Sequence, residues 1–217
     1  MCIRDRLEVS LNRGDTSSRI LCRPIADWNE PDFGDSANMP SEKYELGLPN
    51  NFSKAVPDGD TFLRNVCETC GFVAYQNPKV VVGAVIHCEG RIVLCRRAIE
   101  PRAGFWTVPA GYLEVGETVA EGTMREAREE AGAELIIENV LAVYTIPEVA
   151  QVHIMHVARL DPPQIQAGPE SSEVKLFEWD QIPWSDLAFP SVRWTLMHFK
   201  MVEGRSTFPV FTSPLSG

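Results

Sequence analysis

Residues 111–133, GYLEVGETVAEGTMREAREEAGA, decide the fold of this chain. The first part is rich in glycine and acid, which is typical of a turn, and the rest predicts a helix over residues 119–131. Thr118 and Glu121 have the spacing of a reciprocal capping box at the start of that helix. Gly132 suits a left-handed stop at its end. The stretch therefore predicts a turn that leads into a short, capped helix.

The predicted helix has an acidic face and a small apolar face. At about 100° per residue, Glu126, Glu129 and Glu130 share one side. The adjacent side can pack closely against a sheet and is formed by Ala120, Met124, Ala127 and Ala131. Three neighbouring carboxylates repel one another, and a hard divalent cation such as Mg²⁺, which prefers oxygen ligands, would relieve that repulsion. For three acids alone, the alternative is a solvated acidic face.

The wider spacing resembles the Nudix box, the pattern of hydrolases that cleave a nucleoside diphosphate linked to another moiety. That pattern is G-x5-E-x7-R-E-U-x-E-E-x-G-U, where U is aliphatic. Every fixed position is filled, with alanine as a small variant at both aliphatic ones: Gly111, Glu117, Arg125, Glu126, Ala127, Glu129, Glu130, Gly132 and Ala133. The resemblance implies an α/β fold over residues 79–203, an α/β/α sandwich with a mixed β-sheet.

Apolar runs outside the box predict elements of that sandwich. Residues 80–86 and 91–95 are rich in β-branched side chains and flank Cys88-Glu89-Gly90, which predicts a β-hairpin. Their continuous apolar character favours strands covered on both faces. Further strands are predicted at residues 135–145, 152–160 and 174–179, and a closing helix at residues 191–202.

The same resemblance implies the chemistry of the box. Mg²⁺ or Mn²⁺ would be held by Glu126, Glu129, Glu130 and the main-chain carbonyl of Ala110. Such ions neutralise phosphate oxygens and activate a water molecule. Glu117 and Arg125 are expected to form an ion pair that steadies the loop against the helix. Family members differ in their general base, which in some comes from a later loop. Glu170 and Glu173 are the loop candidates here, and a solvated turn position is the alternative for each.

Composition and charge limit the partners. The 217 residues, 44% hydrophobic and 23% charged, can bury one core and a minor appendage. A formal net charge of -10 argues against a nucleic-acid partner, which requires a basic face. No apolar run approaches the roughly 20 residues that span a bilayer. We expect a small-molecule nucleotide substrate and, from the family resemblance, a homodimer. Six irregularly spaced cysteines favour a reducing compartment, the cytoplasm first and a plastid as the alternative.

The residues before the Nudix domain divide into two predicted segments. Residues 1–54 lack a sustained apolar period and are predicted to be an extension or linker. Residues 204–217, at the other end of the chain, are predicted to be a tail. Residues 55–78 contain Cys67-Glu68-Thr69-Cys70-Gly71, half of a zinc ribbon. A structural zinc ion needs four ligands, usually from two such knuckles, and no second C-x2-C is present upstream. Cys67 and Cys70 are therefore predicted to belong to a metal-free, degenerate ribbon, with bound zinc as the alternative.

Substrate identity depends on residues outside the box. The segments YQNPKVVVG (75–83), PAGYLEVGE (109–117) and GPES (168–171) resemble a zinc-ribbon subgroup that includes a plant plastid enzyme hydrolysing FAD and ADP-ribose. Two alternatives stay open. Zinc-ribbon NADH pyrophosphatases carry S-Q-P-W-P-F-P-x-S, of which this chain has only AFPS at residues 188–191. Non-catalytic, nucleotide-sensing Nudix modules usually lose box glutamates, which this chain keeps.

Four side chains are candidates for contact with the substrate: Arg96, Arg97, Tyr75 and Phe105. The two arginines follow a predicted strand and could face a phosphate, and the two rings could stack on adenine or flavin. The alternatives are solvated arginines at a strand end and aromatic rings that belong to the core.

Overall fold

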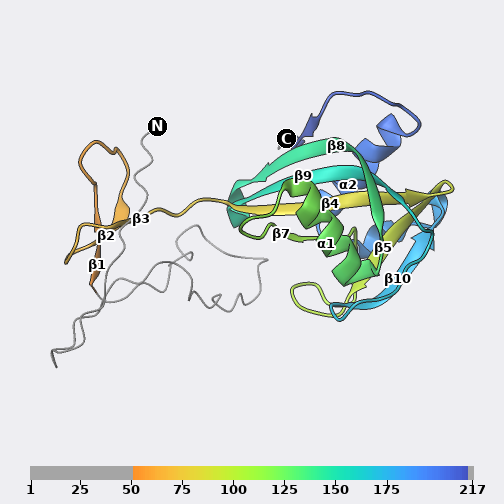
Figure 1. Ribbon diagram of the computed structural model, residues 1–217, viewed down its shortest axis with the longest axis horizontal. Coiled ribbons are helices and arrows are strands. Elements are labelled where there is room, and N and C mark those ends of the chain that lie inside the picture. Colours follow the sequence, from red (N-terminus) through yellow and green to blue (C-terminus); the bar gives the residue numbers. More distant parts are fainter. Residues whose placement is uncertain (1–50, 215–217) are drawn as a thin grey trace. The chain divides into compact units, whose positions relative to one another are not determined.

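The computed structural model describes residues 51–214. The predicted extension at residues 1–54 therefore lies outside the described residues up to residue 50. The described part contains a three-stranded sheet and, further along the chain, an eight-stranded sheet with two α-helices (Figure 1).

The larger sheet has the strand order β10-β5-β4-β9-β8-β11, with β6 paired to β5 and β7 paired to β4. Its strands are β4 (Lys79–Cys88), β5 (Arg91–Arg97), β6 (Trp106–Thr107), β7 (Ala110–Tyr112), β8 (Leu135–Ile146), β9 (Gln151–Leu160), β10 (Ser171–Phe177) and β11 (Phe211–Thr212). β4 runs parallel to β9, and β11 runs parallel to β8. The other named pairs are antiparallel. The sheet is therefore mixed, as predicted.

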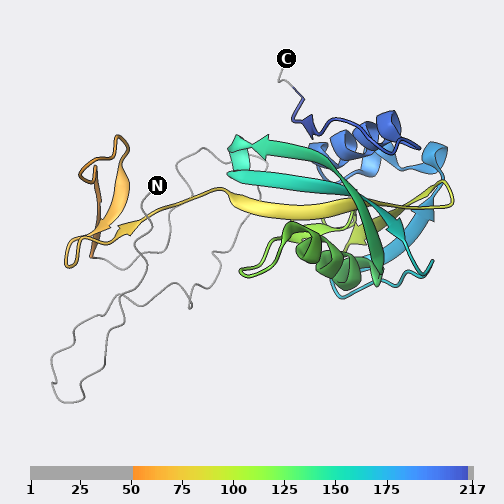
Figure 2. The same ribbon diagram turned by 45° about the horizontal axis from the view of Figure 1, so that its top comes forward.

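Helices α1 (Val119–Ala131) and α2 (Pro190–Val202) cover opposite faces of this sheet (Figure 2). Successive side chains of a strand point to opposite faces, and β4 shows the alternation directly. Val85 packs in the core cluster that contains Leu196 of α2, whereas Ile86 packs in the cluster that contains Ala127 of α1. The predicted α/β/α sandwich is confirmed.

The hairpin between β4 and β5 also matches its prediction. Cys88 pairs with Arg91 across a turn formed by Glu89 and Gly90. These two residues have φ angles of 50° and 77°. Positive φ at both central positions is what a type I′ turn requires. Most of both strands is buried, as expected for strands covered on both faces.

Two C-terminal features differ from the prediction. β10 begins at Ser171 and not at residue 174, with a bulge between Ser171 and Glu173. It ends at Phe177 and not at residue 179. Residues 204–217, predicted to be a tail, contain β11, where Phe211 pairs with Ala142 of β8. The Phe211 ring stacks on His198 of α2, with ring centroids 4.2 Å apart. Short 3-10 helices follow β8 and β10, namely η3 (Pro147–Val149), η4 (Trp179–Gln181) and η5 (Trp184–Asp186).

The three-stranded sheet surrounds the predicted knuckle. It consists of β1 (Phe52–Ala55), β2 (Arg64–Cys67) and β3 (Val73–Ala74), all antiparallel. β1 begins before the boundary predicted at residue 55. The Gly71 amide donates to the Cys67 carbonyl at 2.8 Å, and the Cys67 amide donates to the Phe72 carbonyl at 2.8 Å, so the knuckle is a tight turn. In residues 51–214, neither helix has the length and apolar character needed to cross a membrane.

Candidate active site

Helix α1 begins and ends as its caps dictate. The Thr118 amide donates to the Glu121 carboxylate at 2.8 Å, and the Glu121 amide donates to Thr118 Oγ1 at 3.2 Å. Gly132 closes the helix with a φ of 57°. These local contacts set the register of the box, because the capping box satisfies two backbone groups that have no partner within the helix.

The C-terminal end of α1 holds the loop that precedes β10. The Gln166 amide donates to the Ala131 carbonyl at 2.7 Å, and the Gly168 amide donates to the Glu130 carbonyl at 3.2 Å. Gly168 lies so close to α1 that a Cβ there would overlap the Glu129 carbonyl. The loop therefore follows the helix end closely, and it brings Glu170 to the same region.

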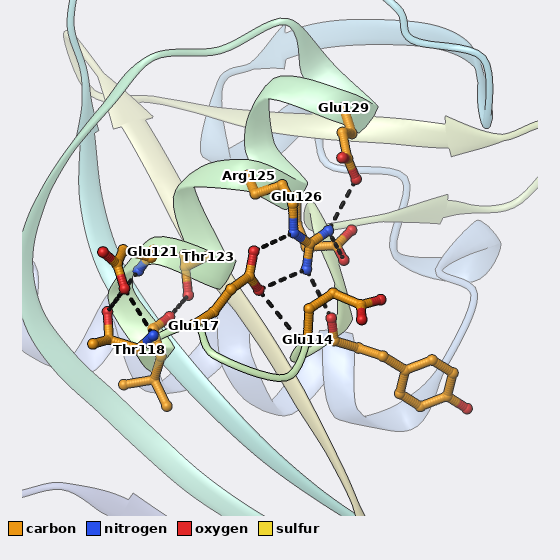
Figure 3. A network of polar contacts seen from close by, with 10 residues as sticks. Glu114, Glu117, Thr118, Glu121, Thr123, Arg125, Glu126 and Glu129 are labelled. Atoms are coloured by element: carbon orange, nitrogen blue, oxygen red, sulfur yellow. Dashed lines mark hydrogen bonds and ion pairs between the residues drawn. The ribbon is translucent and has the colours of Figure 1, made fainter. Parts of the chain in front are cut away.

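The Arg125 guanidinium stands at the centre of the box (Figure 3). Nε and Nη2 contact the two Glu117 carboxylate oxygens at 2.7 and 3.1 Å. Nη1 contacts Glu126 Oε1 at 2.7 Å and Glu129 Oε2 at 2.9 Å. Nη2 also donates to the Tyr112 carbonyl at 2.8 Å. The bidentate ion pair of Arg125 with Glu117 ties the glycine-rich loop to α1. The hydrogen bond from Arg125 holds the pKa of Glu117 below its usual value.

Glu130 is the most buried acid of the box. Its side chain lies under β7, where Oε2 accepts a hydrogen bond from the Ala110 amide at 3.0 Å. Burial raises the pKa of Glu130 to about 7, and the carboxylates of Glu126 and Glu170 add to that rise, whereas the Ala110 amide and Arg97 oppose it. The share of this rise that comes from the neighbouring carboxylates reflects a negative potential, which favours a bound cation.

The position of the Glu126 carboxylate depends on the absence of a side chain at Gly111. A Cβ built on Gly111 would lie well under 3.0 Å from the carboxylate of Glu126. The glycine therefore lets the helix acid rest directly against the β7 backbone. Burial raises the pKa of Glu126, which the neighbouring Arg125 opposes.

The donor atoms at this site suit a hard divalent cation. Glu126, Glu129 and Glu130 offer carboxylate oxygens, the ligands that Mg²⁺ and Mn²⁺ prefer. The Ala110 amide points at Glu130, and the amide and carbonyl of one strand residue point to the same side in antiparallel pairing, so the Ala110 carbonyl also faces the acids. Within residues 51–214, no three acidic, histidine or cysteine side chains form a ready metal cluster. A cation that takes all three carboxylates has to compete with Arg125 for two of them.

The two loop candidates for the general base have different surroundings. Burial is the main cause of the raised pKa of Glu126 and Glu130, and the Glu170 carboxylate contributes to both shifts. The Glu170 carbonyl accepts a hydrogen bond from the Ala98 amide at 2.8 Å, which fixes the loop beside β5. Glu173 instead pairs with Arg96 across β10 and β5, at 3.8 Å between Oε2 and Nη1. The structure therefore brings Glu170, and not Glu173, toward the box.

The four predicted substrate contacts lie in different places. Arg97 lies near enough to Glu130 to oppose the rise of its pKa, whereas Arg96 faces Glu173 on the neighbouring strand. The ring of Phe105 lies under the Arg102 guanidinium, 4.0 Å from its centroid. Tyr75 lies between β3 and β4, 61% exposed, with Arg64 over its ring. Of these four side chains, Arg97 is the one whose charge acts on an acid of the box, and it pairs with Ser171, next to Glu170.

The knuckle cysteines differ in exposure. Cys67 is fully buried and its Sγ accepts a hydrogen bond from Asn51 at 3.2 Å, whereas Cys70 is exposed. No metal cluster that includes these two residues is found in the part of the chain from residue 51 to residue 214.

Two features carry no signal in the sequence pattern, one within the box and one at the start of α2. Tyr112 occupies an unspecified position of the box, yet its carbonyl binds Arg125 and its hydroxyl accepts from Gln151 at 3.1 Å. A pocket of about 340 Å³ lies between the residue 98–105 loop and the start of α2. It combines segments far apart in the sequence, so only an alignment or a structure could have found it.

Comparison with known proteins agrees with the geometry. The NUDIX domain model matches residues 77–197, and the Nudix N-terminal zinc-ribbon model matches residues 50–76. An ADP-ribose pyrophosphatase of Methanocaldococcus jannaschii is 29% identical over 113 residues, which are 50% of this chain and 67% of that protein. The crystal structure of a NUDIX hydrolase from Nitrosomonas europaea is 38% identical with a TM-score of 0.70, over 75% of this chain and 93% of that chain.

A more distant structure shares the fold alone. The ADP-ribose pyrophosphatase of Streptococcus suis is 20% identical with a TM-score of 0.53, over 63% of this chain and 100% of that chain. The resemblance to a zinc-ribbon-containing Nudix protein is confirmed, because both family models match neighbouring segments. Since the NUDIX domain model alone spans more than half of the residues and the box, sandwich and solved structures agree with it, the chain belongs to the Nudix hydrolase family.

Proposed function

We propose that this chain hydrolyses the pyrophosphate bond of a nucleoside diphosphate linked to a second moiety, with a divalent cation. ADP-ribose is the first candidate substrate and would give AMP and ribose 5-phosphate. FAD is the second and would give FMN and AMP. The observation that carries the proposal is the meeting of Glu126 and Glu130 with the backbone of Ala110 and Gly111. The ADP-ribose pyrophosphatase among the relatives supports the choice of substrate.

The acids of α1 and the Ala110 carbonyl are the groups that would hold the cation. Bound Mg²⁺ or Mn²⁺ supplies positive charge at the phosphate oxygens and lowers the pKa of a water molecule. The ion pair of Glu117 and Arg125 holds the loop in place, so that the Ala110 backbone stays next to Glu130. Burial of Glu130 strengthens its interaction with any cation, because the surroundings screen charge poorly.

Glu170 is the side chain that we propose as general base. It is exposed to solvent, so a water molecule can reach it, and it lies near enough to influence both Glu126 and Glu130. Its carboxylate would take the proton of the attacking water. The charge of Arg97 acts on Glu130, and Arg97 would face the phosphates of the substrate.

The experiment that tests this function is chromatographic product analysis. The purified chain is incubated with ADP-ribose, FAD or NADH, each with Mg²⁺, with Mn²⁺ and with a chelator. AMP with ribose 5-phosphate, or AMP with FMN, is expected only when a cation is present. AMP from NADH as the main reaction would favour the NADH pyrophosphatase alternative. Tight binding of all three without any product would favour the nucleotide-sensing alternative.

Three properties of the whole protein are predictions with direct measurements. Light scattering of the purified chain checks the homodimer expected from the family resemblance. Zinc analysis of untreated and metal-stripped protein checks the ribbon at Cys67 and Cys70, which we predict to be metal-free. Fractionation of cells from the source checks the compartment, for which the cytoplasm is expected and a plastid is the alternative.

A further inference from the structure

A pocket at the start of α2 has no assigned role. It has a volume of about 340 Å³ and lies where the residue 98–105 loop meets η5 and the start of α2. The side chains that matter for its chemistry are two arginines and three aromatic residues, listed from the loop onward as Arg102, Trp184, Phe189, Arg193 and Trp194. A cavity of this volume is large enough for a small aromatic ligand.

Three arginines that line this pocket or contact its lining have no acidic partner in residues 51–214. Every arginine of residues 51–214 other than Arg97, Arg102, Arg193 and Arg205 has a carboxylate within 4.0 Å. Arg97, Arg102 and Arg193 have none in the same range. Each binds one backbone carbonyl instead, of Pro101, Ala188 and Trp184 respectively.

A guanidinium has five N–H donors, so most donors of these three side chains are available to a ligand. The chain has a net charge of -10, with 30 acidic residues. In a chain with this many acidic residues, three arginines without a carboxylate partner in residues 51–214 point to a bound anion. Arginine recognises phosphate by two parallel hydrogen bonds.

The aromatic side chains give the pocket a second kind of surface. Trp184, Phe189 and Trp194 line the pocket and are half-buried, so part of each residue is accessible. The Arg193 guanidinium lies over the Trp184 ring at 5.3 Å from its centroid. Planar bases stack on such rings, and a nearby guanidinium adds to the attraction. Rings beside unpaired arginines match a ligand with an aromatic base and a phosphate.

Arg97 contacts a residue of the pocket and also belongs to the strand that pairs next to Glu170. The Arg97 guanidinium lies over the ring of Phe189, 5.5 Å from its centroid, and Phe189 lines the pocket. Arg97 pairs with Ser171 across β5 and β10, and the amide of the next residue, Ala98, donates to the Glu170 carbonyl at 2.8 Å. The Arg97 amide also donates to the Phe105 carbonyl at 2.9 Å, which joins the residue 98–105 loop to the end of β5. A ligand could thus extend from the pocket past Arg97 to the carboxylates.

We propose that this pocket binds one nucleoside monophosphate unit of the substrate, with its aromatic base against the rings of Trp184, Phe189 and Trp194 and its phosphate toward Arg97 and Arg102. The identity of the ligand rests on the proposed function, in which the pyrophosphate lies at the box. Arg193 holds the base and orients the unit, and the second phosphate and its moiety extend toward α1.

Calorimetric titration of the full chain without metal tests this proposal apart from catalysis. The probes are AMP, FMN and ribose 5-phosphate, and the variants are Arg193→Gln and Trp184→Leu. Arg205→Gln is the matched control, since Arg205 also lacks a carboxylate partner in residues 51–214 but does not line the pocket. At least one of AMP and FMN should bind more than about tenfold tighter than ribose 5-phosphate. Arg193→Gln should weaken that binding by about tenfold, the usual loss for a charged hydrogen bond.

Kinetics add a readout that a structural defect would not give. With the better substrate, Arg193→Gln should raise KM about tenfold and leave kcat nearly unchanged, because the contact is equally strong in the ground and transition states. The proposal is overturned if both variants bind AMP and FMN like the wild type, or if ribose 5-phosphate binds as tightly as either nucleotide. If Trp184→Leu does not fold, Arg193→Gln decides alone. Pocket-dependent binding of AMP without any hydrolysis would refute the proposed function and leave the pocket assignment standing.

Discussion

Gly111→Ala adds one methyl group at the point where β7 passes α1. The new Cβ would lie well under 3.0 Å from three atoms of the Glu126 carboxylate, whereas ordinary van der Waals contact begins near 3.4 Å. The Gly111 backbone is not in the left-handed region, so alanine fits its conformation. The carboxylate lies at the end of a flexible side chain and is the group that has to move, by roughly 1 Å to restore a normal contact.

That displacement predicts a loss of turnover with little loss of stability. A misplacement of about 1 Å at a reacting centre can lower kcat by about 100-fold. The contact of Glu126 with Arg125 at 2.7 Å is weakened as well, but a partly exposed ion pair contributes only up to about 1 kcal/mol. For a domain of this size, such a change shifts Tm by about 2–4 °C.

The assay is AMP release from ADP-ribose by Gly111→Ala, Glu126→Gln and the double variant, with thermal unfolding of each. If Gly111→Ala acts through Glu126, the double variant should be no slower than the slower single variant, since one group cannot be removed twice. Wild-type kcat in Gly111→Ala would refute the reasoning. So would a double variant in which the two losses multiply.

Further predictions concern stability and are measured by urea unfolding. Gly168→Ala should destabilise the chain by about 1–3 kcal/mol, because its Cβ would overlap the backbone carbonyl of Glu129, which cannot turn away as a side chain can; an unchanged midpoint would contradict this. Burial lowers the pKa of His153 from 6.5 to about 4, so between these pH values the unfolded chain binds a proton that the folded chain does not. The free energy of unfolding should therefore fall as the pH falls through that window, by at most roughly 3 kcal/mol, and His153→Gln should flatten the fall. Phe211→Ala removes the ring that stacks on His198 and should cost about 1–2 kcal/mol, whereas a true tail would show no effect.

The parts of the fold whose signals lie in residues adjacent in the sequence were predictable from the sequence. Helix α1 spans Val119–Ala131 as predicted, because its capping box and its glycine stop are local signals that act without tertiary contacts. The turn at Glu89 and Gly90 is local in the same way. By contrast, β11 exists because Phe211 meets both β8 and α2, and strand formation depends on such partners more than on the segment itself.

The candidate site shows the same division. The box pattern identified Glu117, Arg125 and the three helix acids, since their spacing is fixed by one loop and one helix. It could not show that Arg125 binds Glu126 and Glu129 together, because that choice depends on rotamers. Nor could it show the pocket, whose arginines come from segments that only the fold brings together.

The carboxylates of α1 are the groups that we propose to hold the cation for hydrolysis. Their role is tested by the kcat for ADP-ribose with Mg²⁺ and with Mn²⁺, measured for the wild type, Glu129→Gln and Glu130→Gln. Glu134→Gln is the matched control, because Glu134 pairs with Arg128 near the end of the same helix but is more than half exposed. A loss of about 100-fold or more, typical of removing one charge-stabilising contact, is predicted for the first two variants with Tm near the wild-type value. Near-normal kcat in both, or an equal loss in Glu134→Gln, would contradict the claim.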